Sequence, residues 1–310
     1  MKKTFIFKFV CILATFVLLF QLSFGFLLPL LLVHSGDSTM QRWYNFFRHP
    51  VDAELVILGS SRVHRHFDPS VIETKTGMKT EDIATGGALF NFLEALYKDY
   101  LKLNKSPKVF IFGLDLSGLY NSDLVPNPEF FFQGMLPSSS ISQLPAFQLV
   151  NTPRSFGYFY YKEFYFNAIV NPEKNTFYKG FEACDLKWGE VKDPGSGEVL
   201  ENFSFGIDPI LIDRIMKFIS KQAENGSQSF AVIAPEFNSV WKFESNRNEA
   251  VEEVYSIAKK YKVRIINFSD TSYKVNFDKN YFYNTQHLNA KGATLFSKDF
   301  CDSLAKYVKR

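Results

Sequence analysis

The chain has 310 residues, of which 46% are hydrophobic, and its formal net charge is +3. This length suits one large domain with an elaborate insertion. The weak positive charge, with no Lys/Arg-rich run, does not favour a nucleic-acid partner. The three cysteines lack the spacing of a zinc site, so we expect neither a metal nor a cofactor.

The N-terminus predicts a membrane anchor over residues 1–33. Three lysines within the first eight residues precede an uncharged run over 9–33. As a helix that run would be about 37 Å long, enough to cross a hydrocarbon core of about 30 Å. A signal peptide cleaved near Ser23-Phe24-Gly25 is the alternative, but cleavage there would leave an apolar new N-terminus. We therefore expect an uncleaved, single-pass signal anchor with the body outside the cytoplasm, in the periplasm or at the cell surface.

After a predicted stalk over 34–51, strands alternate with helices. We expect strands over 52–59, 80–84, 108–114, 229–234 and 263–268, and helices over 69–76, 89–103, 209–225, 244–261 and 290–308. The first strand is a continuous apolar run, as in a parallel strand buried on both faces. The alternation predicts a three-layer α/β sandwich with a mainly parallel sheet, formed by a domain over 52–310.

An irregular, aromatic-rich passage interrupts this pattern at about 117–207, where prolines and Ser/Gly-rich stretches recur. So long an irregular passage is often a lid or a binding surface. A capping subdomain whose aromatic side chains pack only against each other is an equally good interpretation. Residues 193–197 predict a turn between two short strands. Cys184 and Cys301 are expected to be buried free thiols rather than a disulfide.

The predicted strands end in glycine, proline or polar residues. These ends are Gly59-Ser60-Ser61, Gly86-Gly87, Gly113-Leu114-Asp115 and Pro235-Glu236. In open α/β sheets, ligands bind at the carboxyl ends of the strands. The convergence of these residues therefore predicts a functional site at that edge of the sheet.

A serine at such an edge needs a base to act as a nucleophile, and histidine is the usual one. His287 follows the last predicted strand and precedes the last helix, so its loop can fold back over the first strand's end. His64 and His66 come soon after the serines and are alternatives. A surface or helix-capping role would be the ordinary interpretation of an isolated histidine.

Together these motifs resemble the SGNH (GDSL-type) hydrolase superfamily. The residues that carry the resemblance are Gly59-Ser60-Ser61, Gly86-Gly87 and Asn284-Thr285-Gln286-His287 with the following Leu288-Asn289 and Gly292. The chain is most similar to the single-span SGNH-like proteins of bacterial envelopes, such as the D-alanyl transfer protein of teichoic acid synthesis and the proteins that O-acetylate alginate. The resemblance covers 52–116, 208–308 and the anchor, and it implies a flavodoxin-like sheet.

The resemblance also implies a role for each matching residue. Ser61 matches the nucleophile, and His287 matches the general base. The amides of Ser61 and Gly87 match oxyanion donors. Two positions depart from the family pattern: Asn284 replaces the aspartate that orients the histidine, and Asp115 occupies the place of an asparagine donor. An uncharged Asn284 can orient the imidazole without stabilising the imidazolium, and an ionised Asp115 cannot donate.

We therefore expect a membrane-anchored acyltransferase or esterase that acts on O-acyl groups of an envelope polysaccharide through a serine acyl-enzyme. Its partners would be the bilayer, the polysaccharide and a membrane-bound O-acyltransferase. The alternative is a non-catalytic SGNH-fold scaffold or binding module, which the two departures favour. A flavodoxin-like nucleotide-binding protein is a weaker alternative, because the sequence has no phosphate-loop pattern.

Overall fold

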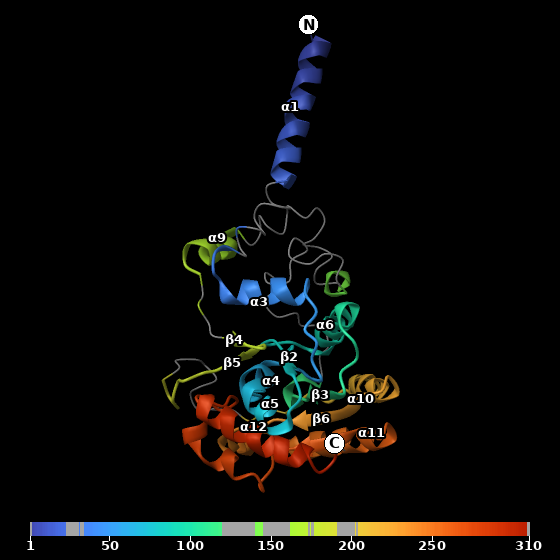
Figure 1. Cartoon of the computed structure of the whole chain (residues 1–310), viewed down its shortest axis with the longest axis vertical. Coiled ribbons are helices and arrows are strands. Elements are labelled where there is room, and N and C mark those ends of the chain that lie inside the picture. The colour runs from blue at the N-terminus through green and yellow to red at the C-terminus, as the bar shows by residue number, and fades with distance from the viewer. Residues whose placement is uncertain are drawn as a thin grey trace. The chain divides into compact units, whose positions relative to one another are not determined.

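Two compact units make up the chain. The computed structural model describes residues 2–22, 31, 34–119, 140–144, 162–172, 174, 177–190, 202 and 204–308. One unit comprises Met1–His49 and Asn127–Asn175, and the other comprises Pro50–Pro126 and Thr176–Arg310. In Figure 1 the colour follows the residue number, so the described segments of each unit can be found by their colours.

The described elements of the first unit are all helical. Its described helices are α1 (Lys2–Leu22), α3 (Ser38–Phe46), the 3-10 helix η4 (Ile141–Gln143) and α9 (Lys162–Val170). Helix α3 lies within the predicted stalk. The Asp37 carboxylate caps it by accepting from the backbone N–H of Met40 at 2.9 Å. The helix is amphipathic and buries Met40, Trp43 and Phe46.

The predicted membrane anchor lies only partly within the described residues, because 23–30 and 32–33 are outside them. Among the helices that are described, none combines the length and the apolar character needed to cross a membrane.

A five-stranded parallel sheet forms the centre of the second unit. Its strands are β1 (Leu55–Leu58), β2 (Thr80–Asp82), β3 (Val109–Gly113), β6 (Gln228–Ile233) and β7 (Arg264–Asn267). They lie in the order β2-β1-β3-β6-β7, and every neighbouring pair is parallel. All residues of β1 and β3 are buried, as the continuous apolar runs predict. The chain reverses its winding direction between β1 and β3, which places a topological switch point there.

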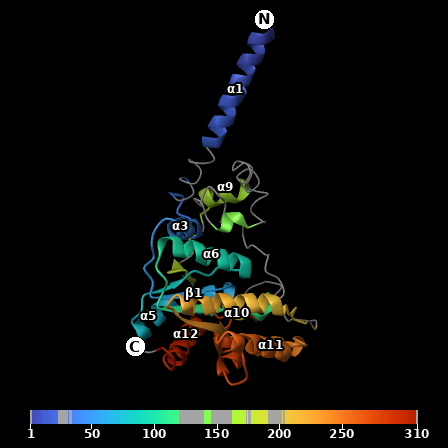
Figure 2. The ribbon, with the colours of Figure 1, turned by 90° about the vertical axis from the view of Figure 1, so that its right-hand side faces the viewer.

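Helices cover both faces of this sheet (Figure 2). Helices α5 (Pro69–Thr76) and α12 (Ala290–Leu304) pack together on one face, over a core that includes Leu55 and Ile57. On the other face, α6 (Phe90–Leu103) and α10 (Pro209–Glu224) place aromatic rings against Phe110, with centroid separations of 4.7 Å to Tyr97 and 5.8 Å to Phe218. Helix α11 (Arg247–Lys260) contacts α10 and β7. The predicted three-layer α/β sandwich with a mainly parallel sheet is confirmed.

Local differences from the sequence expectation have physical causes. The helix expected from residue 244 begins at Arg247, because Glu244 still caps the preceding 3-10 helix η5 (Asn238–Phe243) and donates its backbone N–H to the Trp241 carbonyl. Short strands β4 (Phe177–Tyr178) and β5 (Phe181–Glu182) form a hairpin within the predicted insertion. Both residues of its two-residue turn have positive φ, as a tight hairpin turn requires.

Much of the remaining insertion, including the turn predicted at 193–197, lies outside the described residues. The free thiols predicted at Cys184 and Cys301 are confirmed, and both are buried.

Candidate active site

Ser61 begins a helix, with two residues between it and the end of the buried strand β1. The six-residue helix α4 (Ser61–His66) has Ser60 as its N-cap residue, in an extended conformation. The turn is tight because Val63 packs on two strand-end glycines. A Cβ atom at Gly59 or Gly113 would collide with Cγ2 of Val63. The absence of side chains at these strand ends lets α4 sit against the sheet, and this fixes Ser61 at the carboxyl edge.

His287 lies within hydrogen-bond distance of Ser61, although 226 residues separate them in sequence. The Nε2 atom of His287 is 2.8 Å from Oγ of Ser61. On the other side of the ring, Nδ1 is 3.0 Å from Oδ1 of Asn284. The structure thus brings together the three residues that the sequence analysis expected to meet. The order Ser–His–Asn is that of a nucleophile, a base and a group that orients the base.

Asn284 fixes the tautomer of His287. Its Oδ1 also accepts backbone N–H groups from Gln286 at 2.9 Å and from His287 at 2.8 Å. These two donors show that the amide oxygen, and not the NH2 group, faces the ring. Nδ1 must therefore carry the proton, which leaves the Nε2 lone pair to accept the Ser61 hydroxyl. The ring of Tyr283 stacks against the imidazole, with centroids 5.5 Å apart and planes at 8°.

The His287 ring is neutral at pH 7. Burial, followed by the positive charges of Arg62 and Arg65, lowers the pKa of His287 to about 3. Asp115 is the nearby carboxylate that opposes this shift, but it is too weak to reverse it. Asparagine in place of aspartate at position 284 is consistent with this low pKa, because an amide contributes no negative charge to hold a proton on the ring.

The other two histidines near Ser61 have separate partners. Nε2 of His64 is 3.0 Å from a carboxylate oxygen of Glu182 on β5. His66 is fully buried, and its Nε2 accepts the backbone N–H of Leu288 at 3.1 Å. That bond ties α4 to the loop that carries His287. The structure therefore favours His287 over the alternatives, and it adds His66 as a residue that holds the base's loop.

Gly87 lies beside Ser61, where the sequence analysis placed an oxyanion donor. Both residues line one pocket, and Gly87 has a φ of 70°, which glycine adopts without strain. At the neighbouring Gly86, an added Cβ would be 3.8 Å from Cβ of Ser61. Within the described part of the chain, the amides of Ser61 and Gly87 donate to no backbone acceptor.

Asp115 also lies in this pocket, but as an acceptor. Its carboxylate accepts the Ser60 hydroxyl at 3.2 Å, and the hydroxyl and backbone N–H of Ser117 at 2.7 and 3.1 Å. Burial opposes its ionisation, but the Arg62 charge and these hydrogen bonds outweigh burial and lower the pKa of Asp115. The carboxylate is therefore ionised at pH 7 and cannot donate to an oxyanion.

A buried charge network that sequence reasoning missed lies beneath the serines. Arg62 donates to Glu236 at 2.9 Å, and its Nε is 3.7 Å from Asp115. Glu236 also pairs with Arg247 and accepts from Ser269 at 2.8 Å. The polar ends of β1, β3, β6 and β7 thus join along the carboxyl edge. The sequence placed Pro235-Glu236 at a predicted strand end and so pointed to Glu236. No sequence pattern near Glu236 identifies Arg62 as its partner.

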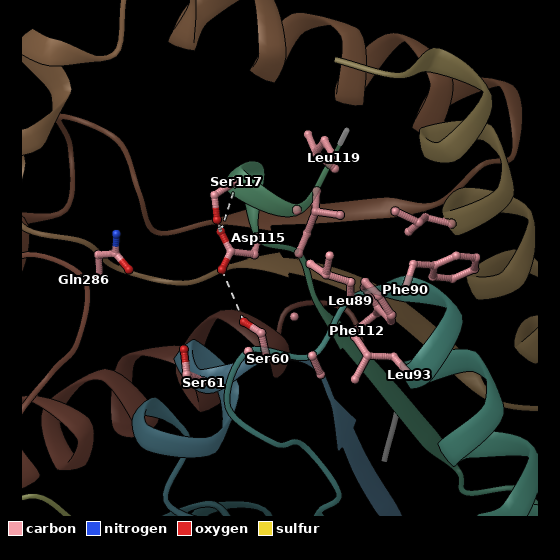
Figure 3. A pocket seen from close by; sticks show the side chains of 16 residues that line it. Ser60, Ser61, Leu89, Phe90, Leu93, Phe112, Asp115, Ser117, Leu119 and Gln286 are labelled. Atoms are coloured by element: carbon pink, nitrogen blue, oxygen red, sulfur yellow. Dashed lines mark hydrogen bonds between the residues drawn. The ribbon is translucent and has the colours of Figure 1, made fainter. Parts of the chain in front are cut away.

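The pocket beside Ser61 has a volume of about 340 Å³ and lies at the switch point between β1 and β3. Figure 3 shows it with polar side chains at one end, namely Ser61, Ser60, Asp115, Ser117 and Gln286. Apolar side chains form the other end, where Figure 3 labels Leu89, Phe90, Leu93, Phe112 and Leu119. Ile215 of α10 also lines the pocket. No group of three or more His, Cys, Asp or Glu side chains within the described residues is arranged to hold a metal ion.

Fold and site together define a three-layer α/β protein with a Ser–His–Asn arrangement at its switch point. No protein-family model and no curated protein matches the sequence. Among solved structures, the YxiM protein of Bacillus subtilis is similar at 10% identity and a TM-score of 0.43, over 82% of this chain and 56% of that one. The acetyl xylan esterase Est2A of the rumen bacterium Butyrivibrio proteoclasticus is similar at 11% identity and a TM-score of 0.38, over 81% of this chain and 63% of that one. This chain therefore spans less than two thirds of either protein.

Proposed function

We propose that the protein is a serine-dependent ester hydrolase or O-acyltransferase that works through an acyl-enzyme on Ser61. One observation carries the proposal: Oγ of Ser61, the His287 ring and Oδ1 of Asn284 form a continuous chain, with separations of 2.8 and 3.0 Å. The neutral imidazole with a free Nε2 lone pair is the state that a general base requires.

The chemistry follows from this geometry. Oγ of Ser61 attacks the ester carbonyl carbon while its proton moves to Nε2 of His287. The tetrahedral intermediate collapses, the bond to the leaving alkoxide breaks, and His287 returns the proton to that alkoxide. Water or a sugar hydroxyl then attacks the acyl-enzyme, gives its proton to His287, and releases the acyl group with the proton restored to Ser61. Hydrolysis and transfer differ only in the attacking hydroxyl.

The developing oxyanion would bind the backbone amides of Ser61 and Gly87. The first is an N-terminal amide of α4, which has no acceptor within its own helix. Asp115 contributes no donor, so the oxyanion would have fewer donors than an esterase site with an asparagine there. One missing donor typically lowers the rate by about 10²–10³. We therefore expect a slow enzyme on simple esters.

For the substrate, we propose O-acyl groups of a cell-envelope polysaccharide, handled outside the cytoplasm by a protein anchored through residues 1–33. The motif resemblance and the apolar N-terminal run support this part of the proposal. A membrane-bound O-acyltransferase is the proposed partner. Tethering both proteins to one bilayer would raise their effective concentration and favour hand-over of the acyl group.

Covalent labelling tests the proposal. We expect a fluorophosphonate to phosphonylate the full-length chain once, with a Ser61–phosphorus bond formed and fluoride released. Ser61→Ala should abolish labelling, and Ser60→Ala should retain it, as measured by intact mass. A folded wild-type chain that resists labelling would contradict the acyl-enzyme mechanism. That outcome would favour the alternative, a non-catalytic scaffold, for which Asn284 and Asp115 are the supporting observations.

A further inference from the structure

The pocket beside Ser61 changes character along its length. Its end at Ser61 is polar, whereas its far end is formed by six apolar side chains from the start of α6, the end of β3 and its following turn, and α10 (Figure 3). Phe90, Leu93 and Ile215 are at most 4% exposed, so that end is a fixed part of the core. A ligand that reaches from Ser61 into this pocket meets a polar environment first and an apolar one beyond it.

We propose that this apolar end binds the alkyl chain of the substrate's acyl group, and that the preferred acyl group is an uncharged chain of about four to eight carbons rather than acetyl. The inference rests on the proposed function, because it requires the ester carbonyl to lie at Ser61. It adds the substrate class: an ester of a short to medium-chain fatty acid.

A saccharide fits this end poorly. A sugar ring would lose its water at a wall of leucine, isoleucine and phenylalanine side chains that offers no hydrogen-bond partner. Each hydroxyl buried without a partner is penalised by about 1–3 kcal/mol in proteins. An alkyl chain gains from the same burial. Asp115 at the polar end is ionised, so like-charge repulsion also disfavours acyl groups that end in a carboxylate.

The pocket's size also exceeds what an acetyl group needs. Its volume is about 340 Å³, whereas a single water molecule needs only about 10–15 Å³ of such cavity space. An acetyl group has three heavy atoms and would leave most of this space empty. Each methylene that enters the apolar end should strengthen transition-state binding about fourfold, which corresponds to about 0.8 kcal/mol.

A homologous series of p-nitrophenyl alkylphosphonates measures this directly. Ser61 attacks phosphorus, the bond to p-nitrophenolate breaks, and the released phenolate is counted. We expect the second-order labelling rate of the full-length chain, corrected for each reagent's hydrolysis by hydroxide, to rise about fourfold per methylene. From methyl to butyl the rise should be roughly 60-fold, and it should continue to hexyl. A flat or falling series overturns the acyl-chain pocket while the labelling itself upholds the proposed function; no labelling with any reagent rejects the proposed function.

Two matched substitutions, at the two ends of α6, test whether the dependence of the labelling rate on chain length arises in this pocket. Leu89 is half-buried at the start of α6 and lines the pocket, so Leu89→Trp should fill it. Leu103 ends the same helix, is 41% exposed and lies outside the pocket lining. We expect Leu89→Trp to lower the hexyl-to-methyl rate ratio at least tenfold and Leu103→Trp to preserve it. Because both rates come from one preparation, partial misfolding cancels from the ratio. An unchanged ratio in Leu89→Trp overturns the proposal.

Discussion

Asn284 gives His287 an orientation without a charge. The amide oxygen fixes the tautomer through three accepted hydrogen bonds, but it carries no negative charge that would stabilise an imidazolium. As the proposed base, His287 is therefore unprotonated at neutral pH but weak, with a pKa of about 3. A base whose pKa lies far below the working pH accepts a proton reluctantly, which limits its catalytic contribution.

The substitution Asn284→Asp should strengthen this base. A carboxylate at the same position would raise the pKa of His287 and stabilise the imidazolium formed during attack. We expect kcat/KM on a p-nitrophenyl ester at pH 7 to rise roughly tenfold or more. The acid limb of its pH profile should also move to higher pH, because His287 would protonate earlier. Asn280→Asp, the same change at an exposed residue, is the control and should alter neither quantity. Identical profiles for wild type and Asn284→Asp would refute the assigned role.

At the residue scale, sequence reasoning predicted the residues whose signal is local. Ser61 and His287 were predicted from the ends of predicted strands and from the motif pattern, and the structure places them 2.8 Å apart. The pairing of Arg62 was missed, and His66 was considered only as an alternative base, because the roles of both depend on partners far along the chain, Glu236 and Leu288. Such pairings exist only after the sheet and helices have packed, and no spacing in one sequence encodes them.

Helix α4 carries Ser61, the proposed nucleophile, and the position of this helix depends on glycine at two strand ends. Val63 fills the space that a side chain at Gly59 or Gly113 would occupy. Neither glycine has a positive φ, so the requirement for glycine is steric rather than conformational. The sequence signalled the strand ends through these glycines, but the helices predicted from the sequence did not include the short one at Ser61–His66.

The substitution Gly113→Ala should therefore displace α4. Overpacking of this kind typically destabilises a protein by about 1–3 kcal/mol, and the shift of Ser61 away from His287 should lower the phosphonate labelling rate by at least tenfold. Val63→Ala in the same chain removes the colliding methyl groups and should recover much of both losses. A double-mutant cycle on unfolding free energy and labelling rate measures the coupling. Additive effects of the two substitutions would show that Val63 does not transmit the strain.

At the scale of the α/β unit, topology was the most predictable feature. Alternating apolar strands and amphipathic helices determine which faces must be buried, and that requirement leads to a parallel sheet covered on both sides. The order β2-β1-β3-β6-β7 then places the ends of β1 and β3 side by side and creates the pocket. Helix and strand boundaries were less predictable, since they depend on local bonds such as those of η5 before α11.

Two buried neutral histidines make the folded state sensitive to acid. Burial, the repulsion that a protonated His287 would exert and the charge of Arg62 lower the pKa of His66 well below its ordinary value, and the pKa of His287 is lowered to about 3. Above about pH 6.5 these rings are neutral in both the folded and the unfolded state, so they contribute no pH dependence. Below that pH the unfolded chain takes up protons that the folded chain refuses, and stability falls by about 1.4 kcal/mol per pH unit for each ring.

Replacing His66 should remove one of these two contributions. In His66→Gln the new side-chain oxygen can accept the Leu288 N–H, so the loop keeps its tie while the titrating ring is lost. Between pH 6 and 5, we expect the slope of unfolding free energy against pH to be about 1.4 kcal/mol per unit shallower than in the wild type. Above pH 7.5 the two slopes should coincide. Denaturant unfolding of the full chain at several pH values measures the two slopes. Glu244 has a raised pKa, which acts on stability in the opposite direction, but it does so equally in the wild type and in His66→Gln. Equal slopes below pH 6 would mean that His66 is already protonated in the folded chain, which its full burial and its role as an acceptor both oppose.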